Sequence, residues 1–249
     1  MRSLAKRSLR GTFVTAIGLA VLLPSVAQAS VGTASGVPLQ RASESAASHE
    51  RSVHVVATTT GSEVGAASNA LATIAIITDA ARTEGIQHLT FEQGGTTGHE
   101  VIEVVGGIGY FKGDALTLQS FNGFTASAAT RYAGMWLKVT KSDAAFSKVT
   151  SGITMSTLPS QLNLPHPQLL SGLVTVVGYR VKELRAVFAE PTGTVTGTLY
   201  VRSHGAPLPV EETFVQTGGA HGSDVLTNWN ERMTVTPPTS SIPFSATGQ

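Results

Sequence analysis

The sequence predicts an α+β domain in which helices cover one face of a strongly bent antiparallel sheet. Two regions, 53–112 and 173–235, consist of short runs rich in Val, Ile, Thr, Phe and Tyr, separated by Gly, Pro and Ser clusters. Such runs indicate consecutive β-strands joined by turns. Region 113–164 between them has Ala-rich composition and helical spacing. An order of strands, helices and strands, without a repeat of fixed period, is typical of this fold class.

The N-terminal segment 1–29 has the pattern of a secretory signal peptide. Four basic residues precede an apolar run over 11–23, and the small-residue site Ala27-Gln28-Ala29 follows Pro24. The apolar run is shorter than the ~20 residues that a membrane-spanning helix needs. We therefore expect export with cleavage after Ala29. A lipid-anchored protein would need Cys after the signal, where this chain has Ser30, so we expect a secreted, extracytoplasmic protein without a lipid anchor.

Composition excludes several classes of protein. Of the 17 Lys and Arg residues, four lie in segment 1–29, which has no Asp or Glu, so the other 13 face 16 acidic residues and give a net charge of −3. No basic stripe remains for nucleic acid. The chain has no Cys, so disulfides and zinc–thiolate sites are excluded.

The N-terminal region is predicted as a leader followed by a strand meander. Residues 30–51 are rich in Ser, Ala and Gly and are expected to be flexible, with a short helix near Arg41–Glu50. Within the meander, Leu89 and Phe91 alternate with polar residues, which is typical of a strand with one buried face. The predicted strands are Val53–Thr60, Asn69–Thr78, Ile86–Gln93, His99–Val105 and Ile108–Lys112. For Ala66–Leu71 helix and strand both remain open.

The remaining elements are a helical segment, two strands and a closing meander. The predicted helices are Gly113–Ser120, Thr125–Arg131, Ser142–Thr150 and Thr154–Leu164, with a short strand at Met135–Val139. The later strands are Leu173–Val177, Arg180–Phe188, Thr196–Arg202, Leu208–Val215 and Val225–Val235. Trp229 is interpreted as a core anchor near the last strand, or alternatively as a gate. Residues 52–238 therefore form the predicted domain, and 239–249 a disordered tail.

The motifs of common active sites are incomplete, so no catalytic residue, metal ligand or cofactor is predicted. His49 and His54 are five residues apart, whereas two zinc-binding histidines on one helix face are four apart. Gly107-Ile108-Gly109 lacks the third glycine at dinucleotide-loop spacing and a following helix. Neither G-x-S-x-G nor a phosphate-binding G-K-[ST] occurs. Glu103 and Asp114 have no evident partner and are interpreted as solvated. We therefore expect a protein that is not an enzyme.

A bent sheet beneath helices can enclose an apolar cavity between the two layers. The inward-facing positions are candidates for its wall, and the alternative is that they fill a dry core. These candidate ligand-pocket residues are Ile74, Ile76, Leu89, Phe91, Ile102, Val104, Val174, Val176, Leu199, Val201 and Phe214.

Several segments resemble the actinobacterial LppX/LprG-type lipoproteins, which are similar to the LolA/LolB lipoprotein carriers. The similar segments are Tyr110–Asp114 (YFKGD), Tyr132–Lys138 (YAGMWLK), Thr198–Val201 with Leu208–Glu211 (TLYV…LPVE), and Trp229–Glu231 (WNE) with Pro237. The resemblance implies a curved antiparallel half-barrel with helices over its concave face, and a hydrophobic cavity for acyl chains. Members of this family bind lipids or move them across the cell envelope. This chain differs in lacking the lipidated Cys.

The leading hypothesis is an exported, non-enzymatic monomer that binds a lipid or another hydrophobic ligand and acts in lipid transport in the cell envelope. A membrane protein or an envelope lipoprotein is a further candidate partner, and nucleic acid is not. The alternative is a structural, adaptor or sensor-partner module with a filled core. A hydrolase has no motif in its support.

Overall fold

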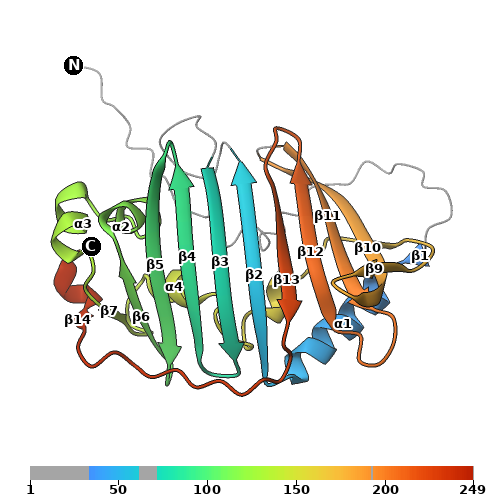
Figure 1. The fold of residues 1–249 in the computed structure, drawn as a ribbon, viewed down its shortest axis with the longest axis horizontal. Helices are drawn as coiled ribbons and strands as arrows, with labels where there is room; N and C mark the ends of the chain where they lie inside the picture. The colour runs from blue at the N-terminus through green and yellow to red at the C-terminus, as the bar shows by residue number, and fades with distance from the viewer. Residues whose placement is uncertain (1–33, 62–71, 192, 249) are drawn as a thin grey trace.

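The computed structural model describes residues 34–61, 72–191 and 193–248, and these form one large, curved, unclosed sheet with helices on one side (Figure 1). The predicted signal peptide, Ser30 and Asn69–Leu71 lie outside the described residues. Strand pairings are antiparallel except for the parallel pair β7–β14. The α+β prediction is confirmed. No helix in these ranges is long and apolar enough to cross a membrane.

The sheet has fourteen strands in the order β1-β8-β10-β11-β12-β13-β2-β3-β4-β5-β6-β7-β14, and β9 pairs with β10. In the first half of the chain the strands are β1 Ala34–Ser35, β2 Ser52–Gly61, β3 Ala72–Ala81, β4 Gly85–Gln93, β5 Thr96–Val105, β6 Ile108–Gly113 and β7 Leu137–Val139. In the second half they are β8 Gln168–Leu169, β9 Val174–Val176, β10 Tyr179–Glu190, β11 Gly193–Arg202, β12 Pro209–Gln216, β13 His221–Thr227 and β14 Ile242–Pro243.

The meander β2–β6 and the closing meander β10–β13 are joined edge to edge, because β13 pairs with β2 in the middle of the sheet. The last predicted strand, Val225–Val235, is corrected to His221–Thr227. Asn228 and Asn230 have positive φ angles of 51° and 69°, which end the extended conformation. Trp229 follows the strand and packs against the buried cluster that includes Val53 and Leu226.

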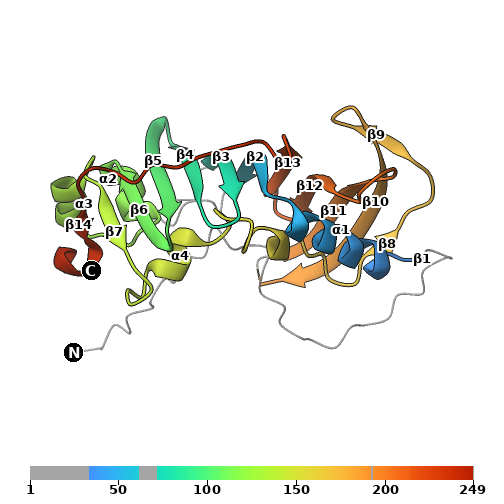
Figure 2. The same ribbon diagram turned by 90° about the horizontal axis from the view of Figure 1, so that it is seen from below.

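Helices lie on one side of the sheet, which we call the concave face; Figure 2 shows α4 and α1 beneath different strands. The helices are α1 Val37–His49, α2 Ala115–Ser120, α3 Ala126–Tyr132 and α4 Phe146–Thr150, with 3-10 turns η1 Pro159–Gln161 and η2 Phe244–Thr247. The predicted helix Thr154–Leu164 is wrong outside η1. Before η1, Thr157 Oγ1 donates to the carbonyl of Thr154, and within η1 Ser160 Oγ donates to the carbonyl of Thr157.

Helix α1 confirms the short helix expected near Arg41–Glu50 but begins earlier, at Val37, within the leader expected to be flexible. Its sheet-facing residues are Gln40, Ser43 and Ala47 rather than large apolar ones, so its sequence does not look amphipathic. The Gln40 side chain holds the helix in place: its Nε2 donates to Asn163 Oδ1 at 2.5 Å, and its Oε1 accepts from the Leu164 amide at 3.1 Å. Hydrogen bonds from Gln40, rather than a hydrophobic face, therefore hold α1 against the sheet.

The disordered tail predicted over 239–249 is wrong for Ile242–Thr247. β14 pairs with β7, and the Phe244 ring lies 6.0 Å from the rings of Phe111 and Phe124. These residues belong to the largest buried cluster, beneath β5, β6 and β7. The C-terminal segment therefore completes one end of the core.

Candidate functional site

Strand register places side chains of eight neighbouring strands in rows across the concave face. The partners in one row are Leu184, Leu199, Glu212, Asp224, Ala57, Ile76, Leu89 and Glu100. The next row contains Ala186, Gly197, Phe214, Gly222, Thr59, Ile74, Phe91 and Gly98. Each row lies on one face because side chains alternate along every strand.

Burial in both rows is interrupted in the middle. The outer residues are buried, whereas six positions on β12, β13, β2 and β3 are partly exposed. We call these positions the central strip: Phe214, Gly222, Asp224, Ala57, Thr59 and Ile76. Three of the six are Ala, Gly or Thr, and the Phe214 ring lies over Gly222, where a Cβ would clash with it. The central strip is therefore an accessible part of an otherwise covered face.

Packed side chains border the central strip on three sides. Towards β4, the Phe121 ring meets Phe91 edge-on at 5.1 Å. Towards β10, Leu164 lies so close to Gly197 that a Cβ there would be 2.6 Å from Leu164 Cδ2. On the third side, two residues along β2 and β13 from Ala57 and Asp224, the side chains of Val55 and Leu226 pack against Met155, Leu158 and Leu162. These contacts confine the exposed area to four central strands.

The predicted pocket residues fall into three groups. Ile76 and Phe214 belong to the central strip. Val174 and Val176 do not reach it, because β9 forms a short hairpin with β10 near the end of the sheet, and Val174 is 44% exposed. The other predicted positions are buried in the packed clusters on either side: Ile74, Leu89, Phe91, Ile102, Val104, Leu199 and Val201.

A pair of acidic residues lies at the edge of the strip and was not predicted. Glu212 on β12 and Asp224 on β13 are direct cross-strand partners. Glu212 is only 3% exposed, and its Oε2 has no hydrogen-bond partner. The sequence did contain a signal: the alternation that places Phe214 inside also places Glu212 inside. Glu103 and Asp114, the acids considered from the sequence, lie apart, since Asp114 caps α2 by accepting from the Thr117 amide.

Burial perturbs the acids of the concave face. It raises the pKa of Asp224 to about 6, and burial together with the charge of Asp224 raises the pKa of Glu212 well above its usual range. Burial also raises the pKa of Glu100, at the covered end of the same row, to about 7. Glu100 accepts a 2.7 Å hydrogen bond from Asn122 Nδ2, whereas Glu212 Oε2 accepts none.

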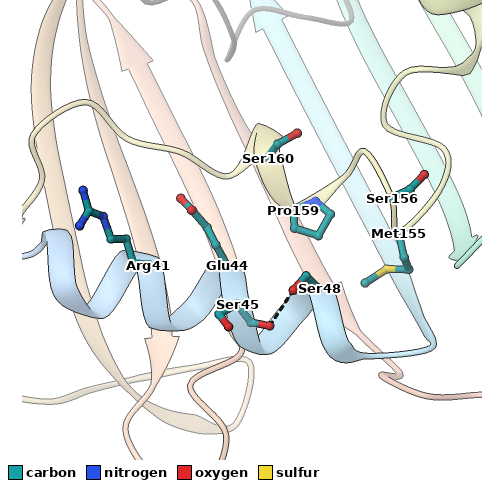
Figure 3. Close-up of a pocket in the computed structure, with 8 residues that line it drawn as sticks. All are labelled: Arg41, Glu44, Ser45, Ser48, Met155, Ser156, Pro159 and Ser160. Carbon is teal, nitrogen blue, oxygen red and sulfur yellow. Dashed lines mark hydrogen bonds between the residues drawn. The ribbon is translucent and has the colours of Figure 1, made fainter.

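A second feature is an open hollow of about 610 Å³ between α1 and the segment before and within η1 (Figure 3). It is lined by Arg41, Glu44, Ser45, Ser48, Met155, Ser156, Pro159 and Ser160. Six of the eight lining residues have polar or charged side chains, so the hollow can hold water or a polar group. Among the described residues, no group of three or more His, Asp or Glu is placed to hold a metal ion.

The curved, unclosed α+β sheet defines a half-barrel fold that solved structures share. LprF from Mycobacterium bovis is 14% identical, with a TM-score of 0.51 over 84% of this chain and 100% of that one. The Mycobacterium tuberculosis lipoprotein LppX is 16% identical, with a TM-score of 0.48 over 80% and 97%. No protein family profile and no curated protein matches the sequence. The predicted resemblance to LppX/LprG-type proteins is confirmed at the level of the fold.

Proposed function

We propose that this protein binds the acyl chain of a lipid, or another hydrophobic ligand, on the central strip, and that it carries such a ligand in the cell envelope. The observation that carries the proposal is the interruption of burial on the concave face. A sheet whose outer parts are covered by aromatic and aliphatic side chains leaves Ile76 and Phe214 accessible. The likeness in fold to LprF and the resemblance of the sequence to a lipid-binding family point the same way.

The energetics suit such a ligand. Burial of one methylene contributes about 0.8 kcal/mol, so a chain of about ten carbons offsets the cost of ordering a ligand without a charged clamp. Binding of this kind needs a surface with the right spacing rather than a catalytic motif. In keeping with the predicted signal, we propose an exported monomer without a lipid anchor and without enzymatic activity.

The test begins with the protein purified from its native host. Organic extraction followed by mass spectrometry identifies any lipid that co-purifies, and the expected result is about one amphiphile per chain. Ile76→Asp in the central strip then lowers the bound lipid strongly, because a carboxylate replaces apolar contact. Ile77→Asp is the matched control, since Ile77 is the next residue on β3, lies on the opposite face and is 44% exposed.

Phe214→Asp and Val215→Asp form a second matched pair on β12, because Val215 is 60% exposed on the opposite, convex face. Loss of lipid in both variants of a pair, with the fold intact by circular dichroism, would contradict the assignment of the central strip. Absence of lipid from the unmodified protein, together with no uptake of added acyl ligands, would contradict lipid binding itself.

A second candidate function is an adaptor that presents its convex face to a protein partner. Val56 and Ile77 are cross-strand partners there, and they are 40% and 44% exposed. Adjacent exposed aliphatic residues on a sheet are a common feature of protein interfaces. The same Ile77→Asp variant separates the two functions: an adaptor loses its crosslinked partner, whereas a lipid carrier keeps its lipid.

A further inference from the structure

The acidic pair Glu212–Asp224 has no role in binding an acyl chain, and its surroundings are informative. In the sheet, Leu199 and Ala57 flank the pair along its row. Phe214 and Gly222 occupy the same face in the next row. The pair is therefore surrounded in the sheet by side chains that carry no charge.

The pair also lacks a counter-ion. Neither carboxyl group belongs to a salt bridge between described residues. Burial is the only cause of the raised pKa of Asp224, and no cation lowers the pKa of Glu212. Buried carboxyl groups in proteins are normally hydrogen-bonded or paired with a cation, because an unpaired one is costly. Glu212 Oε2, in a residue that is 3% exposed, is such an unpaired atom.

Helix α1 adds further unpaired polar atoms to this part of the molecule. The helix packs against β12, the strand that carries Glu212. Its Ser43 Oγ and Glu44 Oε1 are both buried without a hydrogen-bond partner. Ser43 is 1% exposed, so solvent does not replace the missing partner. Among the described residues, the one cation that acts on these acids is Arg41 of α1, and it acts on Glu44 rather than on Glu212 or Asp224.

We propose that the Glu212–Asp224 pair binds the ammonium group of an amphiphile whose alkyl chain lies on the central strip. The inference rests on the proposed function and adds the chemistry of the ligand's polar end. An ammonium group donates up to three hydrogen bonds and supplies the missing positive charge. Asp224 belongs to the strip, so the two parts of such a ligand lie on adjoining side chains.

Competition with a neutral fluorescent probe tests the proposal. N-phenyl-1-naphthylamine bound to the full, delipidated protein at pH 7.5 is displaced in parallel by decylamine, decanol and decanoate, which share one chain length. We expect decylamine to bind at least about tenfold more tightly than decanol, and decanoate most weakly, because a buried charge-assisted hydrogen bond is worth about that factor or more. Lowering the pH to 5 reduces the preference for the amine, because Asp224 becomes protonated.

Isosteric variants connect the preference to the pair. Glu212→Gln and Asp224→Asn keep the side-chain shapes, and each is expected to remove most of the preference for decylamine while decanol still binds. Glu211→Gln is the control, because Glu211 is the preceding residue on β12 and faces the other side of the sheet. The Glu211→Gln variant should prefer decylamine over decanol as strongly as the unmodified protein does.

The outcomes separate the two claims. Equal affinities for the three ligands would overturn the ammonium site and leave the lipid-binding function standing. Failure of the probe and of all three ligands to bind would overturn both. A preference that persists in Glu212→Gln and Asp224→Asn, or stabilisation by Ca²⁺ alone that matches that by decylamine, would also overturn the ammonium site.

Discussion

One end and the middle of the concave face are covered in different ways. Beneath β5, β6 and β7, side chains from α2, α3, α4 and η2 form a continuous buried cluster with three aromatic contacts. Beneath β12, β13 and β2, the cover ends at the central strip, which the buried acid Glu212 borders. The packed end is suited to stability, whereas the central strip has less burial and is the surface on which we propose ligand binding.

The largest expected difference between the two regions is in how much a Phe→Ala substitution lowers the free energy of unfolding. Phe111 is 0% exposed at the packed end, so Phe111→Ala should lower the free energy of unfolding by about 3–5 kcal/mol. Phe214 is partly exposed, so Phe214→Ala should cost about 1–2 kcal/mol but reduce lipid binding strongly. Urea unfolding of both variants measures this, and equal losses would mean that the central strip is part of the structural core.

A second prediction concerns the buried acids and pH. The pKa of Glu100 is about 7 in the folded protein and near 4.5 when unfolded, so the folded state binds the extra proton and stability falls as pH rises from about 4.5 to about 7. Glu100→Gln cannot ionise and still accepts from Asn122, so it should be more stable than the unmodified protein at pH 8 by about 1–3 kcal/mol. At pH 4 the two should be equal.

Glu212→Gln should behave in the same direction, because the pKa of Glu212 is also raised by burial. Urea unfolding at pH 4 and pH 8 gives both differences. If either Gln variant were less stable at pH 8, its carboxylate would be stabilised by a partner, and the contrast between a bonded acid at the packed end and an unbonded one at the strip would need revision.

The smallest effect is expected at the C-terminal segment. Phe244 is partly exposed although its ring contacts Phe111 and Phe124, so Phe244→Ala should cost about 1–2 kcal/mol and leave lipid binding unchanged. Thermal unfolding, combined with the probe assay, checks both parts. A loss of lipid binding at constant stability would indicate that the packed end and the central strip are coupled.

The sequence predicted the sheet better than it predicted the site. Alternation at Leu89 and Phe91 and the glycine turns at 94–95 and 106–107 are local signals, and they placed the strands correctly within a few residues. The cover of the concave face depends on contacts between distant residues. Helix α1 is held by bonds from Gln40 to residues 163 and 164, and no local pattern reveals them.

The candidate pocket shows the same limit. The alternation of side chains along each strand correctly identified which residues face inward. It cannot tell whether another segment of the chain covers a given inward-facing residue. Thus Leu89 is buried under α2 side chains while its neighbour in the same row, Ile76, is partly exposed. The acidic pair matches no catalytic motif, and its sequence signal is a Glu at a strand position whose side chain faces inward.

The pairing of β2 with β13 has a consequence for how the chain folds. The two strands lie near opposite ends of the domain in the sequence, yet they pair in the middle of the sheet. Beside them, the amide of Arg51 donates a hydrogen bond to Asn230 Oδ1. Contacts between residues so distant in sequence form late, because closing a long loop costs entropy before any contact repays it. Each meander therefore keeps an open edge strand until the two pair, and the central strip, which spans this seam, forms only after nearly the whole domain has been synthesised.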